Sequence, residues 1–153
     1  MIVETIRSPG NLGSILRTAE ACGAGGLILV DDHCDPFDPA VVRAAMGALS
    51  HQRFVRATLA QLGEWVRRTG MHVVGLSPEA KPLWTEMPEV KPLGLVLGEE
   101  RQGISPPLRS LCQTTVRLPV MGHVDSLNVA VAAGVALYEL MRRSADATRA
   151  SPV

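Results

Sequence analysis

Two polar side chains, Ser126 and Asn128, open the long apolar segment 127–141 near the end of the chain. They follow a β-rich run that ends near Leu118, so a strand, a loop and a helix meet there. Ser126 suits the N-cap of this helix, and a helix start offers free backbone N–H groups. Hydroxyl and amide groups at such a junction can bind a polar ligand. A capped core helix with one tolerated asparagine is the simpler interpretation of this segment alone.

A pair of carboxylates, Glu99 and Glu100, follows a buried strand that we predict near Leu93–Leu97. Gly98 and Gly103 lie on either side of the pair. Charged groups at the carboxyl end of a buried strand are in the usual position to contact a ligand in an open α/β sheet. A solvated acidic turn is the alternative, and the two glycines favour a binding role.

Asn11 and Arg17 belong to a third segment, which starts with the turn residues at 8–10. Apolar residues at helical spacing follow, and Arg17 lies between them at the edge of the buried stripe. There its guanidinium can reach an anion or a substrate oxygen, whereas an arginine that only extends into solvent is the commoner outcome. The glycine-rich fingerprint of dinucleotide binding is absent from this segment.

The elements that position these groups alternate between strand and helix. Strands are predicted at 3–6, 27–30, 54–56, 72–76, 93–97 and 115–118, and helices at 12–22, 39–46, 59–69, 107–111 and 127–143. This alternation predicts an α/β fold with a mostly parallel sheet and helices on both faces. We expect one domain over residues 1–143 and a flexible tail over residues 144–153.

Composition fits a single globular domain, because 46% of the 153 residues are hydrophobic and 20% are charged. No apolar run reaches the roughly 20 residues that cross a membrane, so we expect a cytoplasmic protein. Cys22, Cys34 and Cys112 are far apart, which suits a reducing compartment and argues against zinc. The loop Asp31–Asp35 contains metal-ligand residue types without the spacing of a metal site, so we expect no metal.

Charge gives no global indication of nucleic-acid binding, because 15 basic residues balance 15 acidic ones. The stretch from Arg43 to Arg68 is locally basic, with five arginines and one acidic residue. Arginine is the residue type suited to bidentate phosphate contacts. Aromatic residues are few, so the sequence shows no surface for stacking bases.

The three polar segments, in this order and at this spacing, resemble the SpoU (TrmH) family of RNA ribose 2′-O-methyltransferases, within the SPOUT class. The sequence N-L-G-S-I-L-R-T-A at residues 11–19 is similar to the family's first motif, N-x-G-x-x-x-R-T-A. G-E-E-R-Q-G-I at residues 98–104 is similar to the second, G-x-E-x-x-G-[LI], and places the family's glutamate at Glu100. L-P-V at 118–120 and S-L-N-V-A-V at 126–131 are similar to the third.

The resemblance spans residues 3–143 and implies a deep C-terminal trefoil knot that holds S-adenosyl-L-methionine (AdoMet). The implied cofactor contacts are Leu76, Gly98, Leu118 and Leu127. The implied catalytic residues are Asn11, Arg17, Glu100, Ser126 and Asn128. The family is also dimeric, and its motif-one arginine, here Arg17, approaches the AdoMet held by the opposite subunit.

The resemblance implies transfer of a methyl group from AdoMet to a ribose 2′-hydroxyl of RNA. An arginine, whose pKa exceeds about 12, is an implausible free base. We therefore expect Arg17 to stabilise the developing alkoxide and to hold the adjacent phosphate. Arg43 matches the arginine of the family's V-R-A-S-x-G segment, in which Ala45 replaces the serine, and is a candidate RNA contact together with Arg17. Small relatives often modify tRNA, so we favour tRNA over rRNA.

Three further departures from the family pattern and two alternatives stay open. Val120 and Ala130 replace a common Met and Ser, and Ser8 replaces the aspartate before the proline. One alternative is a non-catalytic RNA-binding module on the same fold, which the intact motif residues disfavour. Another is a different nucleotide-dependent α/β enzyme, which the missing phosphate loop disfavours. Since motif one begins near the start, we expect no N-terminal RNA-binding domain, so recognition would come from the dimer surface or a partner.

Overall fold

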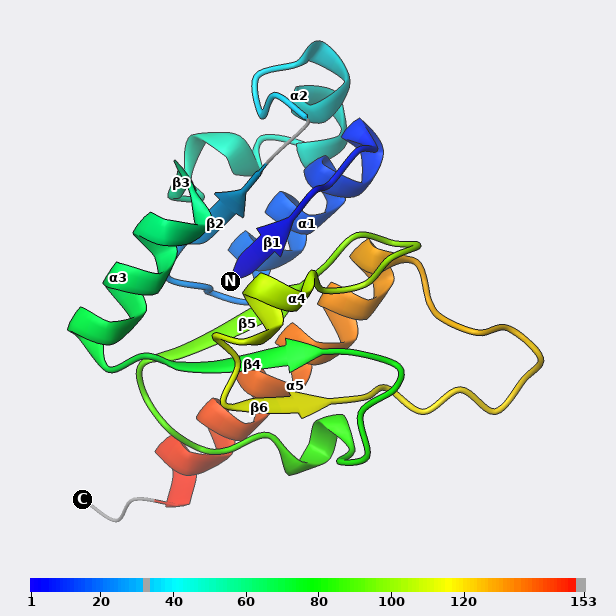
Figure 1. The fold of residues 1–153 in the computed structure, drawn as a ribbon. Helices are drawn as coiled ribbons and strands as arrows, with labels where there is room; N and C mark the ends of the chain where they lie inside the picture. Colours follow the sequence, from blue (N-terminus) through cyan, green and yellow to red (C-terminus); the bar gives the residue numbers. More distant parts are fainter. Residues whose placement is uncertain (32–33, 151–153) are drawn as a thin grey trace.

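A six-stranded sheet forms the centre of the protein, with the strand order β3-β2-β1-β5-β4-β6 (Figure 1). The computed structural model describes residues 1–31 and 34–150. The strands are β1 (Ile2–Glu4), β2 (Leu27–Val30), β3 (Phe54–Ala57), β4 (His72–Leu76), β5 (Leu93–Leu97) and β6 (Thr114–Val116). Each neighbouring pair is parallel. The predicted α/β class with a parallel sheet is confirmed, and β1 and β6 both lie slightly earlier in the chain than predicted.

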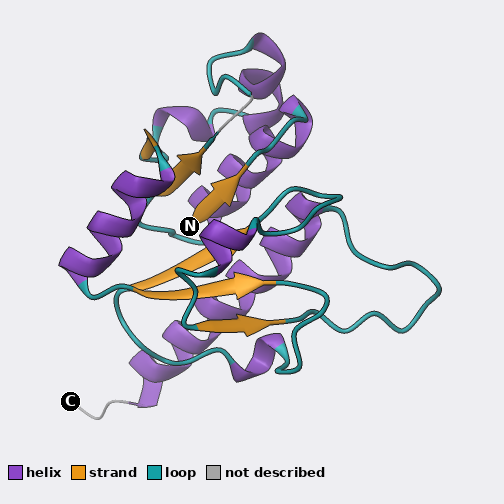
Figure 2. Cartoon of the chain, viewed as in Figure 1, coloured by secondary structure: helices purple, strands orange, loops and turns teal. Residues whose placement is uncertain are grey.

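Helices pack on both faces of the sheet (Figures 1 and 2). They are α1 (Pro9–Ala21), α2 (Pro39–Ala45), α3 (Leu59–Thr69), α4 (Pro106–Arg109) and α5 (Val129–Ala150), with 3₁₀ turns η1 (Ala48–Ser50) and η2 (Trp84–Glu86). In Figure 1, α1 and α5 lie behind the sheet, and α3 and α4 lie in front of it. Each face has its own apolar cluster, one built on α1 and α5 and the other on α3 and α4.

The central strand β1 contributes to both clusters, because successive side chains of a strand point to opposite faces. Ile2 packs with the α3 and α4 cluster, whereas Val3 packs with the α1 and α5 cluster, and both are buried. The chain continues from β1 to β2 on one side, while β5 pairs with the other side of β1. Ligands of open α/β sheets bind outside the carboxyl ends of the strands at such a reversal. The fold therefore directs a site to the ends of β1 and β5.

The final helix, α5, begins later than the sequence predicts. Its N-cap is Asn128, whose Oδ1 accepts hydrogen bonds from the backbone N–H groups of Ala130 (3.0 Å) and Val131 (3.3 Å). The prediction of Ser126 as the N-cap is wrong. Both residue types cap helices well, so their identity could not decide which of them lies where the backbone becomes helical.

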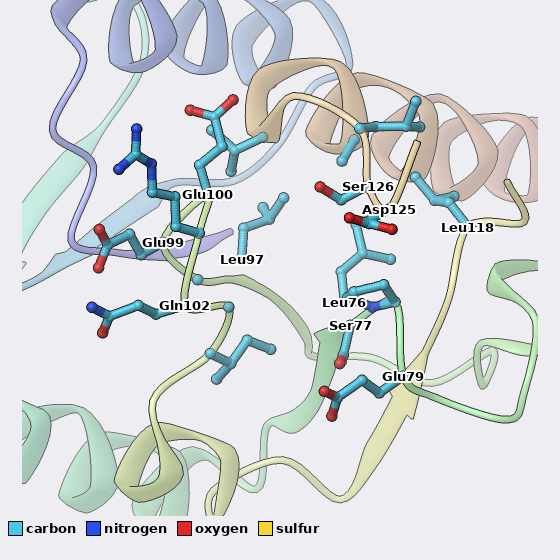
Figure 3. Close-up of a pocket in the computed structure, with 18 of the residues that line it drawn as sticks. Leu76, Ser77, Glu79, Leu97, Glu99, Glu100, Gln102, Leu118, Asp125 and Ser126 are labelled. Atoms are coloured by element: carbon cyan, nitrogen blue, oxygen red, sulfur yellow. The ribbon is translucent and has the colours of Figure 1, made fainter. Parts of the chain in front are cut away.

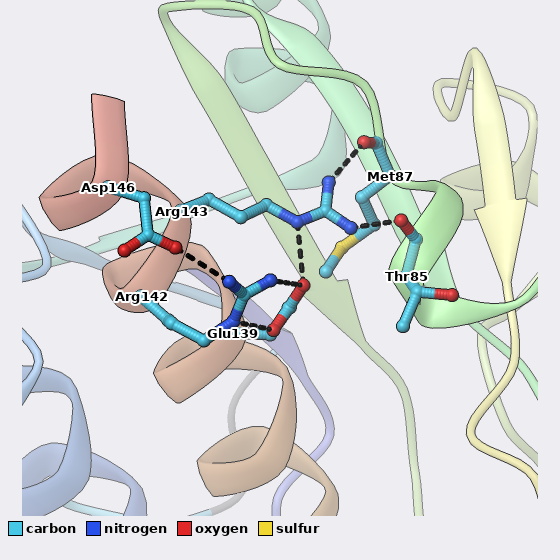
Figure 4. A network of polar contacts seen from close by, with 6 residues as sticks. All are labelled: Thr85, Met87, Glu139, Arg142, Arg143 and Asp146. Atoms are coloured by element: carbon cyan, nitrogen blue, oxygen red, sulfur yellow. Dashed lines mark hydrogen bonds and ion pairs between the residues drawn. The ribbon is translucent and has the colours of Figure 1, made fainter. Parts of the chain in front are cut away.

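An ion cluster around the buried Glu139 ties the second half of α5 to the η2 segment (Figure 4). Glu139 is 7% exposed and accepts hydrogen bonds from the guanidinium groups of Arg142 and Arg143. These hydrogen bonds lower the pKa of Glu139 to about 2. Arg143 also donates to the backbone oxygens of Thr85 and Met87. The cluster therefore fixes the loop that follows β4 against the last helix.

The helix α5 continues to Ala150, beyond its predicted end at Arg143. Alanine-rich sequence and an ion pair between Arg142 and Asp146 (2.7 Å) favour this extension. The flexible tail over residues 144–153 and the trefoil knot stay predictions. Within the part of the chain that the structure describes, no helix is long and apolar enough to cross a bilayer.

Candidate functional site

A cavity of about 280 Å³, the first cavity, lies at the carboxyl ends of β4 and β5 (Figure 3). Its walls come from the residues after β4, the loop after β5 and the chain that leads into α5. The four predicted cofactor contacts, Leu76, Gly98, Leu118 and Leu127, all line this cavity. The fold thus gathers residues from three separate segments around one space, and their contact with a cofactor stays a prediction.

Two glycines shape the turn at residues 98–103, which forms one wall of the first cavity. The backbone N–H of Glu99 donates to the Gly103 oxygen (3.0 Å), and the Gly103 N–H donates to the Glu99 oxygen (2.8 Å). A Cβ atom at Gly98 would lie 2.1 Å from the carbonyl carbon of Gly103, so no side chain fits there. Gly103 has a φ of +70°, which favours glycine. The turn therefore requires glycine at position 98 and favours it at position 103.

Three predicted catalytic side chains, Asn11, Glu100 and Asn128, form one hydrogen-bonded cluster, which we call the amide–carboxylate cluster. Asn128 Nδ2 donates to Glu100 Oε1 (2.9 Å) and to Asn11 Oδ1 (3.1 Å). Asn11 Nδ2 donates to Glu100 Oε2 (3.4 Å). Because Asn128 Oδ1 is the helix cap, its amide nitrogen must face the carboxylate. The cluster joins the three motif segments and fixes both oxygens of Glu100.

A second cavity, of about 480 Å³, adjoins the first. Residues 99–102 of the turn line both cavities, and residues 5–8 after β1 line only the second. In that segment, Arg7 Nε donates to Glu99 Oε1 over 3.0 Å. Arg7 belongs to none of the three motif segments, and nothing in its sequence context predicts a role in the site. A basic residue just past the carboxyl end of a central strand would be a signal for such a contact. The sequence alone does not show that β1 is a central strand, because this depends on the strand order.

The other predicted site residues are placed differently. Ser126 is exposed and lines the first cavity beside Asp125 (Figure 3). Arg17 is exposed on α1 and lines neither cavity, and its side chain makes no hydrogen bond or ion pair with the residues that the structure describes. Arg43 is exposed in the last turn of α2 and also lines neither cavity. One chain therefore brings together all predicted catalytic residues except Arg17.

Residues 1–31 and 34–150 contain no group of three or more His, Cys, Asp or Glu side chains that could hold a metal ion. Of the loop Asp31–Asp35, Asp32 and His33 lie outside the described residues. Burial raises the pKa of Cys112 to about 11, so this thiol stays protonated at neutral pH.

Known proteins with similar sequences indicate the same family. The family model described as the SpoU rRNA Methylase family matches residues 1–138. The 23S rRNA (guanosine-2′-O-)-methyltransferase RlmB of Coxiella burnetii is 34% identical over 144 residues, which are 94% of this chain and 58% of that protein. The chain thus spans about 58% of the length of the first curated relatives that it matches.

Solved structures share the fold. The SpoU methyltransferase AviRb of Streptomyces viridochromogenes, in complex with AdoMet, superposes with a TM-score of 0.88 at 35% identity, over 94% of this chain and 57% of that one. A structure that addresses 2-OH methylation of C/U34 on tRNA has a TM-score of 0.85 at 28% identity and covers 95% of both chains. The family resemblance predicted from the three motifs is confirmed. With the family model matched over residues 1–138, the chain belongs to the SpoU rRNA methylase family.

Proposed function

We propose that the protein transfers a methyl group from AdoMet to a ribose 2′-hydroxyl in RNA. The amide–carboxylate cluster carries this proposal, because it joins three motif segments at the edge of the first cavity. Family membership supports an RNA substrate. The similarity to a guanosine 2′-O-methyltransferase of Coxiella burnetii supports the ribose as the methylated group.

The residues of the first cavity fit AdoMet. Leu76, Leu118 and Leu127 offer apolar surface to an adenine ring. The carboxylate of Asp125, which lines the same cavity, offers negative charge to a sulfonium or an ammonium group, whereas Glu79 is paired with Arg109 (3.6 Å) (Figure 3). AviRb, a relative at 35% identity, was crystallised with AdoMet, which supports the same cofactor here.

When bound in the first cavity, AdoMet would supply an electrophilic methyl group for the ribose 2′-oxygen, whose hydroxyl proton must leave. A ribose hydroxyl is a poor nucleophile until its developing negative charge is stabilised. We assign that role to the Arg17 guanidinium, which also holds the adjacent phosphate as proton acceptor. Asn11, Glu100 and Asn128 fix the walls of the pocket, and the Ser126 hydroxyl orders its entrance.

A homodimer would supply Arg17 to the site, since Arg17 lines neither cavity of its own chain. The helix α5 exposes Val131, Val135 and Tyr138 by 52%, 37% and 52%. These residues lie at positions i, i+4 and i+7, hence on one face of the helix. Because α1 packs beside α5, a second copy that covers this face also meets α1. A two-fold contact would then present Arg17 of each subunit to the first cavity of the other.

The substrate we propose is tRNA, with rRNA as the alternative. The structure that addresses methylation of C/U34 on tRNA matches this chain over 95% of both lengths, which supports a tRNA substrate. The exposed Arg43 on α2 is the additional RNA contact that we propose. We propose a cytoplasmic location, where RNA of either class can be modified.

The test is transfer of labelled methyl from AdoMet to separate pools of unmodified tRNA and rRNA. We expect label in the tRNA pool, resistant to alkali at one linkage, and none with Arg17→Ala. Calorimetry should give the same AdoMet affinity for the variant and the wild type. Full activity of Arg17→Ala would remove Arg17 from the mechanism. A wild type that binds AdoMet and RNA but labels neither pool would support the non-catalytic RNA-binding module.

A further inference from the structure

The second cavity has the position and the chemistry of an acceptor site. It adjoins the first cavity through residues 99–102 and Val129, which line both. The amide–carboxylate cluster lies at this junction, because Asn11 lines the second cavity and Glu100 lines both. A methyl donor and its acceptor must be neighbours during transfer, with the reacting atoms about 3 Å apart. Two adjoining cavities provide that arrangement.

We propose that the second cavity binds the nucleotide that accepts the methyl group, and that Arg7 contacts a phosphate next to its ribose. This inference rests on the proposed function, and it adds a residue outside the three motifs. The ribose would lie at the junction near Glu100, with its backbone phosphate directed toward the segment 5–8.

The geometry of Arg7 supports a phosphate contact. Its Nε donates to Glu99 Oε1, and Glu99 itself is only 16% exposed, so the guanidinium has a fixed partner. The Arg7 side chain is 64% exposed. Its two terminal nitrogens make no hydrogen bond with the described residues, which leaves a planar edge for two phosphate oxygens.

The remaining lining suits a nucleotide as well. The hydroxyl of Ser8 and the side chains of Arg101 and Gln102 add polar groups to the cavity. Both carboxylates in the lining are engaged: Glu99 by Arg7, and Glu100 by two asparagine amides. The guanidinium of Arg7 and the amides of Asn11 and Asn128 therefore offset the repulsion between these carboxylates and an incoming phosphate.

The experiment compares wild type, Arg7→Ala, Arg7→Lys and the control Lys81→Ala, which removes an exposed basic side chain that lines neither cavity and lies outside the basic stretch 43–68. The RNA is a pool of unmodified tRNA transcribed in vitro. We expect Arg7→Ala to raise the KM for tRNA roughly tenfold or more. The slope of log K for tRNA binding against log salt concentration should become shallower by about 1, as expected for the loss of one phosphate contact. The AdoMet affinity should be unchanged.

Substitution of Arg7 by lysine separates the effect of positive charge from that of the bidentate geometry of a guanidinium. Arg7→Lys keeps the positive charge and should retain the wild-type salt dependence, but it loses the bidentate contact and should have an intermediate KM. Lys81→Ala should match the wild type in both quantities. An Arg7→Ala variant with the KM and salt dependence of an active wild type would overturn this inference alone. A wild type that transfers no methyl to either RNA pool would overturn the proposed function as well.

Discussion

Asn128 donates through its side-chain nitrogen to Glu100 Oε1 over 2.9 Å, while its side-chain oxygen caps α5. One residue therefore stabilises the last helix and orients a carboxylate that lines both cavities. The two roles use opposite ends of the same amide, so substitutions can separate them.

Substitution of Asn128 should separate helix capping from site geometry. Asn128→Ala removes the cap and should lower the free energy of unfolding by about 1 kcal/mol. Asn128→Ser keeps a capping oxygen and should be nearly as stable as the wild type, but it lacks the donor to Glu100. We expect both variants to lose methyl transfer by about two orders of magnitude. Urea denaturation and initial rates measure the two effects, and a fully active serine variant would show that the Glu100 contact is dispensable.

Mixed dimers test whether Arg17 acts across subunits. Arg17→Ala and Asn128→Ser should each be inactive alone, but co-expression should restore about a quarter of the sites, each built from one intact half of each subunit. Asn11→Ala mixed with Asn128→Ser is the matched control. Asn11 and Asn128 are hydrogen-bonded within one chain, so this pair should restore nothing. Equal recovery in both mixtures would contradict the arrangement.

The turn at residues 98–103 should tolerate a side chain much less at one glycine than at the other. In Gly98→Ala, the new Cβ meets backbone atoms of Gly103 at 2.1 Å, and backbone cannot move aside cheaply. In Gly103→Ala, the Cβ meets nothing within 4 Å, and the cost is the left-handed conformation, about 1–2 kcal/mol. Calorimetry with AdoMet should show lost binding for Gly98→Ala and weakened binding for Gly103→Ala. The reverse order would contradict the described turn.

A buried carboxylate holds the chain just after this turn. Glu4, 5% exposed at the end of β1, accepts hydrogen bonds from the backbone N–H of Ser105 (2.9 Å) and from its hydroxyl (2.5 Å). Glu4→Ala leaves these donors without their acceptor and should lower the free energy of unfolding by about 2–3 kcal/mol. Glu4→Gln keeps one acceptor oxygen, so its free energy of unfolding should fall by less than that of Glu4→Ala. Equal stability of all three proteins in urea denaturation would show that Ser105 finds other partners.

The ion cluster on α5 should make stability depend on pH in the acid range. The pKa of Glu139 is about 2 in the folded protein, below its ordinary value of 4.5, because Arg142 and Arg143 donate to the carboxylate. The stabilisation by the Glu139 carboxylate is therefore complete above about pH 4.5, and it is lost as the pH falls toward 2. Glu139→Gln should be less stable than the wild type at neutral pH, and the difference should shrink through this window. Thermal denaturation across this pH range measures it, and a constant difference would contradict the assignment.

The order and type of the elements could be predicted from the sequence, because each buried strand and amphipathic helix has its own apolar period. The amide–carboxylate cluster could be anticipated only from the family motifs. Nothing in local sequence indicates that Asn11 and Asn128, 117 positions apart, share a hydrogen bond. Arg7 was missed for the same reason: its relation to Glu99 depends on β1 and β5 being neighbours.

Helix ends were the least predictable feature. Ser126 and Asn128 are both good N-caps, and the choice between them depends on where the loop meets α5. The end of α5 was placed at Arg143 because polar residues follow. The structure continues the helix, since alanines and the ion pair from Arg142 to Asp146 favour it. The position of Arg17 outside both cavities could not be predicted from spacing alone.

The cluster that joins Asn11 to Asn128 also has a consequence for synthesis on the ribosome. Residues 1–100 can emerge and pair their strands while the last contributor to the pocket is still in the exit tunnel. Domains fold as their segments become available, and long-range contacts form late. A nascent or prematurely terminated chain that lacks α5 would have the β1 and β5 ends but no third amide to fix Glu100. Catalytic competence would therefore be acquired only once α5 has emerged and Asn128 can donate to Glu100.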